Sequence, residues 1–209
     1  MSKVIRSSVL VCAALAVFAA TSFASPILPG QTIVQFSAEP DPVGGVLVAP
    51  VLTLPFVTGT FSGTLTTMVI SGDTTNTLGG LTFVYTITNN DLSPDAIHRL
   101  TVNGYNGFAT DASYQAAPGQ KPTTIDRSVN GDVIGFGFIG APLGFGELSP
   151  GATSTPLVVQ TNAPAYRQSF ASVIDGTVAT VGTYSPVIPE PMTLGLLLVG
   201  MGTAIIRRR

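Results

Sequence analysis

The sequence predicts an all-β protein, an antiparallel β-sandwich of the immunoglobulin-like or jelly-roll type, over residues 25–186. Three observations predict it. Apolar and Thr residues alternate with a period of two, turn-forming dipeptides separate β-rich runs, and Pro and Gly break the chain at regular intervals without an amphipathic helical stretch between them. A body of this length can bury a core without disulfide bonds. The sequence leaves the choice between the two sandwich types open.

The clearest alternation covers residues 81–88. The apolar positions are Leu81, Phe83, Tyr85 and Ile87, and the positions between them are Thr82, Val84, Thr86 and Thr88. This pattern is typical of a strand with one face on a core and Thr on the other face. Residues 58–70 have a similar composition, and residues 71–80 are rich in Gly, Asp and Asn, so we predict a hairpin over 58–88.

Two dipeptides predict tighter hairpins. Asn130-Gly131 lies between 127–129 and 132–134, and Asp175-Gly176 lies between 171–174 and 177–181. Both dipeptides favour the positive φ angles of a two-residue turn. Further strands are predicted at 31–37, 97–103, 133–139 and 155–161.

The amino terminus has the pattern of a signal helix. Lys3 and Arg6 precede an apolar run over 9–20, and Ser22-Phe23-Ala24 places small residues where signal peptidase requires them. We predict a signal peptide over 1–24, cut between Ala24 and Ser25. Cys12, the single cysteine, leaves with it, so the exported body has neither a disulfide bond nor a thiolate metal site.

The carboxyl-terminal residues 187–209 have the pattern of a sorting signal. Pro189, Glu190 and Pro191 form a strip that is held extended, because each proline disfavours helix in the residue before it. Residues 192–206 carry no charge and predict a short transmembrane helix, about 22 Å long against a hydrocarbon core of about 30 Å. The basic tail, Arg207, Arg208 and Arg209, favours a cytoplasmic end.

These residues resemble the PEP-CTERM sorting signal of Gram-negative bacteria. The resemblance covers 187–209 and implies that an exosortase-type membrane transpeptidase removes the tail after a transient stay in the inner membrane. It implies that Pro189, Glu190 and Pro191 are the recognition tripeptide and that Arg207 to Arg209 are the cytoplasmic stop. Met192 stands where the family more often has a small residue, which leaves the bond that is cut undetermined. Proteins of this kind usually accompany exopolysaccharide.

The charge of the body and its few catalytic residue types argue against several classes of function. The body has four basic and ten acidic residues, which argues against nucleic acid as a partner. His98 is the only histidine, and no Gly-x-Ser-x-Gly motif accompanies it, so we predict no enzyme activity and no cofactor. The expected role is structural or adhesive, at the cell envelope, the surface or the biofilm matrix. The alternatives are a carbohydrate-binding module that stacks sugars on Tyr105, Phe108 and Tyr114, and a glycan-active hydrolase that uses an Asp pair.

Two further clusters have competing interpretations. Oxygen-bearing side chains gather in one predicted loop at Asn89, Asn90, Asp91 and Asp95, which calcium could use. Their spacing lacks the EF-hand pattern and suits ordinary turns, so we predict no metal site. The run over 135–140 alternates Gly with Phe and is followed by no Lys, so it predicts a closely packed strand and not a phosphate loop.

Overall fold

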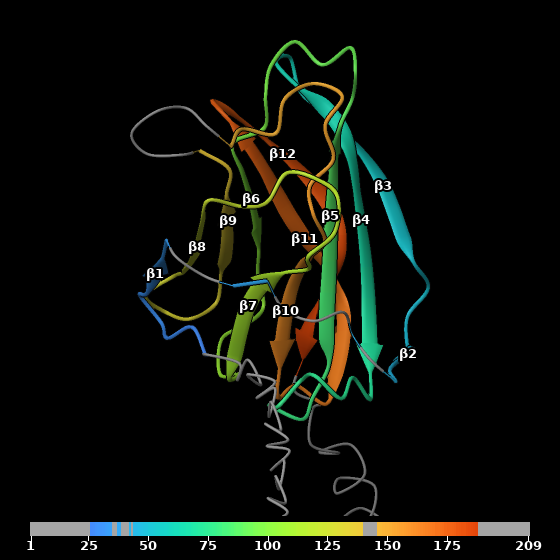
Figure 1. Cartoon of the computed structure of the whole chain (residues 1–209), viewed down its shortest axis with the longest axis vertical. Helices are drawn as coiled ribbons and strands as arrows, with labels where there is room; N and C mark the ends of the chain where they lie inside the picture. The colour runs from blue at the N-terminus through green and yellow to red at the C-terminus, as the bar shows by residue number, and fades with distance from the viewer. Residues whose placement is uncertain (1–25, 35–36, 39–41, 43, 140–145, 188–209) are drawn as a thin grey trace, which may run out of the picture.

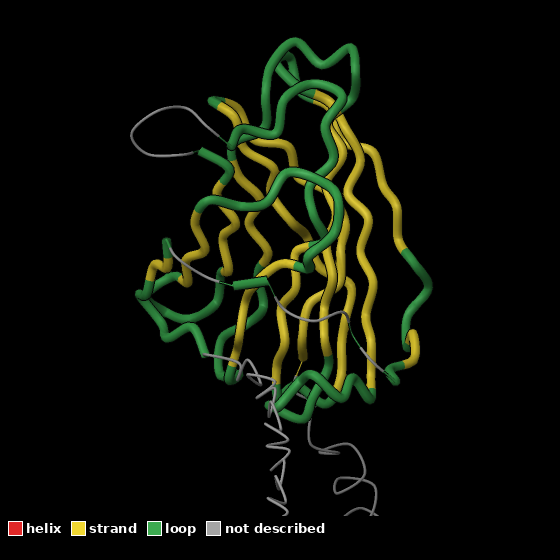
Figure 2. Tube along the Cα trace, viewed as in Figure 1, coloured by secondary structure: helices red, strands yellow, loops and turns green. Residues whose placement is uncertain are grey.

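The computed structural model describes residues 26–34, 37–38, 42, 44–139 and 146–187. Within these ranges the chain forms twelve strands and no helix (Figure 1, Figure 2). All strand pairs are antiparallel, and they form two sheets packed face to face. The predicted antiparallel β-sandwich is therefore confirmed as an all-β, two-sheet architecture.

Each sheet has six strands. The first sheet runs in the order β1 (Thr32–Ile33), β8 (Thr124–Arg127), β9 (Ile134–Gly137), β6 (Arg99–Val102), β11 (Ala165–Asp175) and β12 (Thr177–Val187). The second sheet runs in the order β2 (Val46–Leu47), β4 (Ser62–Ser71), β5 (Thr82–Asn89), β10 (Leu157–Thr161) and β7 (Thr110–Tyr114), and β3 (Leu52–Val57) also pairs with β4. Pro55 falls in β3, which pairs on one side only, where a missing amide proton is tolerated.

The core between the sheets is aromatic and holds a short chain of hydrogen bonds. The Tyr85 and Tyr105 hydroxyls lie 2.6 Å apart, and the Tyr85 hydroxyl donates to the Tyr184 carbonyl at 3.0 Å. Both Tyr85 and Tyr105 have no exposed surface. Because burial disfavours phenolate, it raises the pKa of each hydroxyl well above the ordinary value.

The hairpin predicted over 58–88 is confirmed as β4 and β5, which pair from Gly63↔Asn89 to Ile70↔Thr82. β5 has the predicted apolar face on the core, and in its first half the other face is buried as well. Thr82 and Val84 are as buried as the core residues, and the Ser113 hydroxyl on β7 donates to the Ser37 carbonyl at 2.6 Å. Ser37 therefore lies against the outer face of the second sheet.

The hairpin predicted at Asp175-Gly176 is confirmed but is much longer than expected. β11 and β12 have eleven residues each, and Asp175 pairs with Thr177, so Gly176 alone turns the chain at a φ of 59°. A positive φ at a single turn residue favours glycine, because glycine has no Cβ. The strands extend beyond the predicted 171–174 and 177–181, and the alternation of burial in β12 ends at Thr183, after which both faces are buried through 186.

The hairpin predicted at Asn130-Gly131 is also confirmed, as β8 and β9, with a different turn. Gly131 has a φ of 74°, and its amide donates to the Ser128 carbonyl at 2.8 Å. No non-glycine residue in the described chain has a positive φ, so Asn130 does not adopt the predicted conformation. The turn is longer than two residues and needs glycine at one position only.

The remaining predicted strands are present in shorter form. Residues 31–37, 97–103, 133–139 and 155–161 contain β1, β6, β9 and β10, although 35–36 lie outside the described residues. β9 is the predicted closely packed strand. A side chain at Gly135 would collide with the Arg99 guanidinium, which forms a bidentate ion pair with Asp126 at 2.6 Å per bond.

The two ends of the sandwich are formed by different segments of the chain. Ile27 donates its amide to Thr110 at 2.8 Å, Thr110 pairs with Thr161, and Ala165 pairs with Val187. Residues 27, 71–82, 107–110, 161–165 and 187 therefore lie together, and we call this the entry end (Figure 1).

The opposite end is formed by a different set of loops between strands. The Gly176 turn lies there, and Thr60 and Thr177 share a hydrogen bond of 2.8 Å across the two sheets. The loops after Asn89 and around Leu148 meet beside it, where Asn89 donates to the Leu148 carbonyl at 2.9 Å. We call residues 57–62, 89–98, 146–153 and 175–177 the far end.

Candidate functional site

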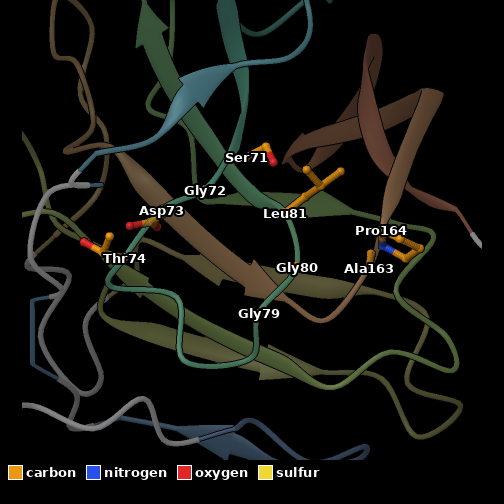
Figure 3. A pocket seen from close by; sticks show the side chains of 9 residues that line it. All are labelled: Ser71, Gly72, Asp73, Thr74, Gly79, Gly80, Leu81, Ala163 and Pro164. Carbon is orange, nitrogen blue, oxygen red and sulfur yellow. The ribbon is translucent and has the colours of Figure 1, made fainter.

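A hollow of about 390 Å³ opens at the entry end (Figure 3). One wall is the loop between β4 and β5, and the other is the chain between β10 and β11. The lining residues are Ser71, Gly72, Asp73, Thr74, Gly79, Gly80, Leu81, Ala163 and Pro164. The walls are close because Gly80 lies against the backbone of Asn162 and Ala163, where a Cβ would not fit.

The β4–β5 loop is held from inside by Asn76, which is buried. Its Nδ2 donates to the Gly80 and Thr161 carbonyls, both at 3.0 Å, and its Oδ1 accepts from the Leu78 amide at 2.9 Å. One amide side chain thus satisfies backbone groups on both walls of the hollow. The loop is a fixed part of the sandwich, although its sequence reads as an ordinary turn.

A chain of polar side chains lies behind the loop. The Thr82 hydroxyl donates to Asp73 Oδ2 at 2.8 Å, and the Thr75 hydroxyl donates to Asp73 Oδ1 at 2.7 Å. Gln160 on β10 then donates from Nε2 to Thr75 Oγ1 at 3.1 Å. The Thr75 hydroxyl thus lies between the Asp73 carboxylate and the Gln160 carboxamide. In chemical terms the carboxylate is a base and the carboxamide contains an acyl group.

Arg127, at the end of β8, forms hydrogen bonds to several separate segments at the entry end. Its guanidinium donates to four carbonyls, those of Ile27, Tyr105, Phe108 and Gly131, at 2.8 to 3.0 Å. Arg127 is 5% exposed, and no carboxylate pairs with it among the described residues. Burial without a counter-ion lowers its pKa.

His98 lies between two carboxylates at the far end. Its Nδ1 is 2.7 Å from Asp175 Oδ1, and its Nε2 is 3.5 Å from Glu147 Oε1. The Asp175 contact resembles the orienting half of a hydrolase triad, but the other ring nitrogen faces a second carboxylate where a hydroxyl nucleophile would stand. The arrangement joins β6, the β11–β12 turn and the loop at 147.

The Asn89 to Asp95 cluster is used by the fold. Asn89 is buried and donates to the Asp95 and Leu148 carbonyls, Asn90 donates to Ser62 Oγ at 3.0 Å, and Asp95 Oδ1 accepts from the Ala96 amide. The Asp95 bond is local turn chemistry of the kind predicted, whereas the Asn89 bond to Leu148 and the Asn90 bond to Ser62 join separate segments of the chain. No group of three or more metal-ligating side chains occurs in the part of the chain that the structure describes.

The three aromatic residues considered for sugar stacking do not form a platform. Tyr105 has no exposed surface and packs edge-on against Phe83, with ring centroids 6.0 Å apart. Phe108 is 9% exposed, and Tyr114 is half-buried against the core. A ring that stacks on sugar needs an open face, so the structure excludes Tyr105 from that role.

The sorting residues and the signal-peptide junction fall outside the described residues. They are Pro189, Glu190, Pro191, Arg207, Arg208, Arg209, Ala24 and Ser25, together with the helices predicted over 1–24 and 192–206. Among the residues that are described, no helix has the length and apolar character needed to cross a bilayer.

Sequence reasoning missed Arg127 and Gln160. A lone Arg in a β-rich sequence is ordinarily a solvated strand residue, and only its Gly131 partner lies nearby in the chain; the other three carbonyls lie 19 to 100 positions away. Gln160 meets Thr75 across 85 positions, which no local pattern reveals. Comparisons with family models, with curated proteins and with solved structures return no match, so no family is assigned from them.

Proposed function

We propose that this protein is an exported, non-enzymatic surface domain, tethered briefly in the inner membrane by residues 187–209 and then processed by an exosortase-type transpeptidase. The observation that carries the proposal is the position of the entry end. β12 ends at Val187, only two residues before Pro189, and Ile27 lies at the same end of the sandwich, close after the expected cut at Ala24.

This arrangement suits processing at both junctions. The predicted cuts fall outside the strands, so neither one removes a strand from either sheet. A tail held in a bilayer would keep the entry end near the membrane and direct the far end outward (Figure 1). The domain would then be released with its core unchanged.

The proposed role is structural or adhesive, within exopolysaccharide or biofilm matrix. Neutral polar pairs support it, since Thr53 with Thr66 and Thr88 with Thr153 share hydrogen bonds of 3.0 Å on exposed strand surfaces. Such surfaces hydrate well without carrying charge, which suits a protein surrounded by glycans. Carbohydrate binding through Tyr105 is not proposed, because that ring is in the core.

Intact-mass spectrometry of the protein recovered from cells tests the sorting proposal. With the transpeptidase present, the mass should correspond to a chain that lacks 1–24 and most of 192–209. Deleting the transpeptidase, or changing Glu190→Ala, should leave the arginine tail attached. Asp91→Ala, at the far end, is the matched acidic control and should be processed normally. Recovery outside the cell of a chain that still ends in its arginines would refute the proposal.

A further inference from the structure

Gln160 has an unusual environment for a strand residue. It is 1% exposed, and its Oε1 is buried without a hydrogen-bond partner among the described residues. Its Nε2 contacts Thr75 Oγ1 at 3.1 Å. A buried carboxamide with an unsatisfied oxygen costs free energy, so this position needs an explanation beyond packing.

Thr75 is arranged as a nucleophile would be. Its hydroxyl donates to Asp73 Oδ1 at 2.7 Å, which is the contact through which a carboxylate accepts a proton. Asp73 is oriented in turn, because the Thr75 amide donates to Oδ1 at 2.9 Å and the Thr82 hydroxyl donates to Oδ2 at 2.8 Å. A nucleophile, a base and a group that orients the base are the parts that acyl transfer requires.

We propose that Thr75 and Gln160 form an intramolecular ester cross-link. Thr75 Oγ1 transfers its proton to Asp73 and bonds to Gln160 Cδ, which forms a tetrahedral intermediate. The Cδ–Nε2 bond then breaks, and the proton on Asp73 passes to the departing nitrogen. The products are an ester between the two side chains and one ammonia molecule, so no oxidant or further reactant is needed.

Position and burial favour this reaction over hydrolysis. The Thr75 hydroxyl oxygen is in hydrogen-bond contact with Gln160 Nε2 at 3.1 Å, so it lies beside the carboxamide whose carbon it would attack. Gln160 and Thr82 are almost fully buried, which keeps water from the acyl carbon. Asp73 lines the hollow of Figure 3, which offers the ammonia a way out.

The cross-link would join the β4–β5 loop to β10 across 85 positions. It would fix both walls of the entry end by a covalent bond, in addition to the hydrogen bonds of Asn76. The inference concerns the folded body alone, so it stands or fails separately from the sorting proposal.

Trypsin digestion of the full-length chain under denaturing conditions tests the link. Cleavage after Arg99, Arg127 and Arg167 places Thr75 in a peptide that ends at 99 and Gln160 in the peptide 128–167. We expect these peptides to be joined, with a combined mass about 17 Da below their sum because ammonia is lost. A succinimide at an Asn-Gly dipeptide gives the same mass change without joined peptides. Alkali should separate the pair and leave a glutamate side chain at position 160.

Single substitutions test the role of each residue in the cross-link. Thr75→Val and Asp73→Asn should abolish the joined peptide, and Gln160→Met should do so even if it weakens the fold. Thr74→Val is the matched control in the same loop and should keep the link. Separate 128–167 peptide at full mass in the wild-type protein would overturn the proposal, and so would a link that survives in Thr75→Val.

Discussion

The entry end and the far end of the sandwich are held by different chemistry. At the entry end, Arg127 and Asn76 donate to backbone carbonyls, and no acidic partner accompanies the buried guanidinium among the described residues. At the far end, His98 lies between the buried Asp175 and Glu147, and His98 and Glu147 are partly exposed. Carbonyl contacts in a dry environment are strong and depend little on salt, whereas partly exposed ion pairs contribute little and are screened.

The difference predicts which end of the sandwich contributes more to stability. The entry end is where the sequence enters and leaves the sheets, so it must resist separation of β12 and the segment at Ile27. The far end carries loops between strands but neither end of the described chain. Stability should therefore depend on the entry end much more than on the charged cluster, and three variants or pairs of variants test this.

The largest expected effect is that of Arg127→Met. This change removes a donor from four buried carbonyls, of which those of Tyr105 and Phe108 keep a second donor, and should lower the free energy of unfolding by about 3 kcal/mol. Asp175→Asn at the far end keeps the shape of the side chain and an oxygen that can accept from His98 Nδ1, so it should cost about 1 kcal/mol. Urea unfolding measures both. Arg167→Met, at an exposed strand position, is the matched control, and equal losses at the two ends would contradict the comparison.

A pair of glycine substitutions gives a smaller difference. Gly80→Ala would place a Cβ against the backbone of Asn162 and Ala163, which cannot move aside, and should cost about 2 kcal/mol. Gly135→Ala meets the flexible end of Arg99, so the main loss is one half-exposed ion pair and should stay below about 1 kcal/mol. Thermal unfolding compares them. A larger loss for Gly135→Ala would show that the first sheet, not the entry end, limits stability.

A modest effect at neutral pH is expected in the core beside Arg127. Tyr105→Phe removes one buried hydroxyl contact and should cost about 1 kcal/mol. The pKa of Tyr85 and of Tyr105 is raised by burial, so both groups hold their protons in the folded protein after the unfolded chain has begun to lose them.

The sign of the pH dependence follows from that shift. The stabilisation is complete below the ordinary tyrosine value of 10.0 and falls as pH rises above it, because the unfolded state then binds fewer protons. Urea midpoints measured between neutral and strongly alkaline pH should be level at first and then decline. The double change Tyr85→Phe, Tyr105→Phe should make the decline shallower, and an unchanged decline would show that other groups cause it.

The parts of the fold that sequence predicted are those set by local chemistry. Gly176 and Gly131 mark hairpins because a positive φ is needed there, whatever the rest of the chain does. β7 was not predicted, because its polar composition gives no apolar face; it is buried by pairing with β10 and by Ser37 lying over it. Arg127 and Gln160 were missed for the same reason, since their roles depend on partners far away in the chain.

The placement of β12 has a mechanical consequence. It is an edge strand whose ladder partner is β11 alone, and its last residue, Val187, lies at the same end as Ile27. A load that pulls these two residues apart would peel β12 from β11 one bond pair at a time, starting at Val187. A load applied between Val187 and the Gly176 turn would instead shear the whole ladder at once. The direction of pull would thus decide whether this domain yields early or late.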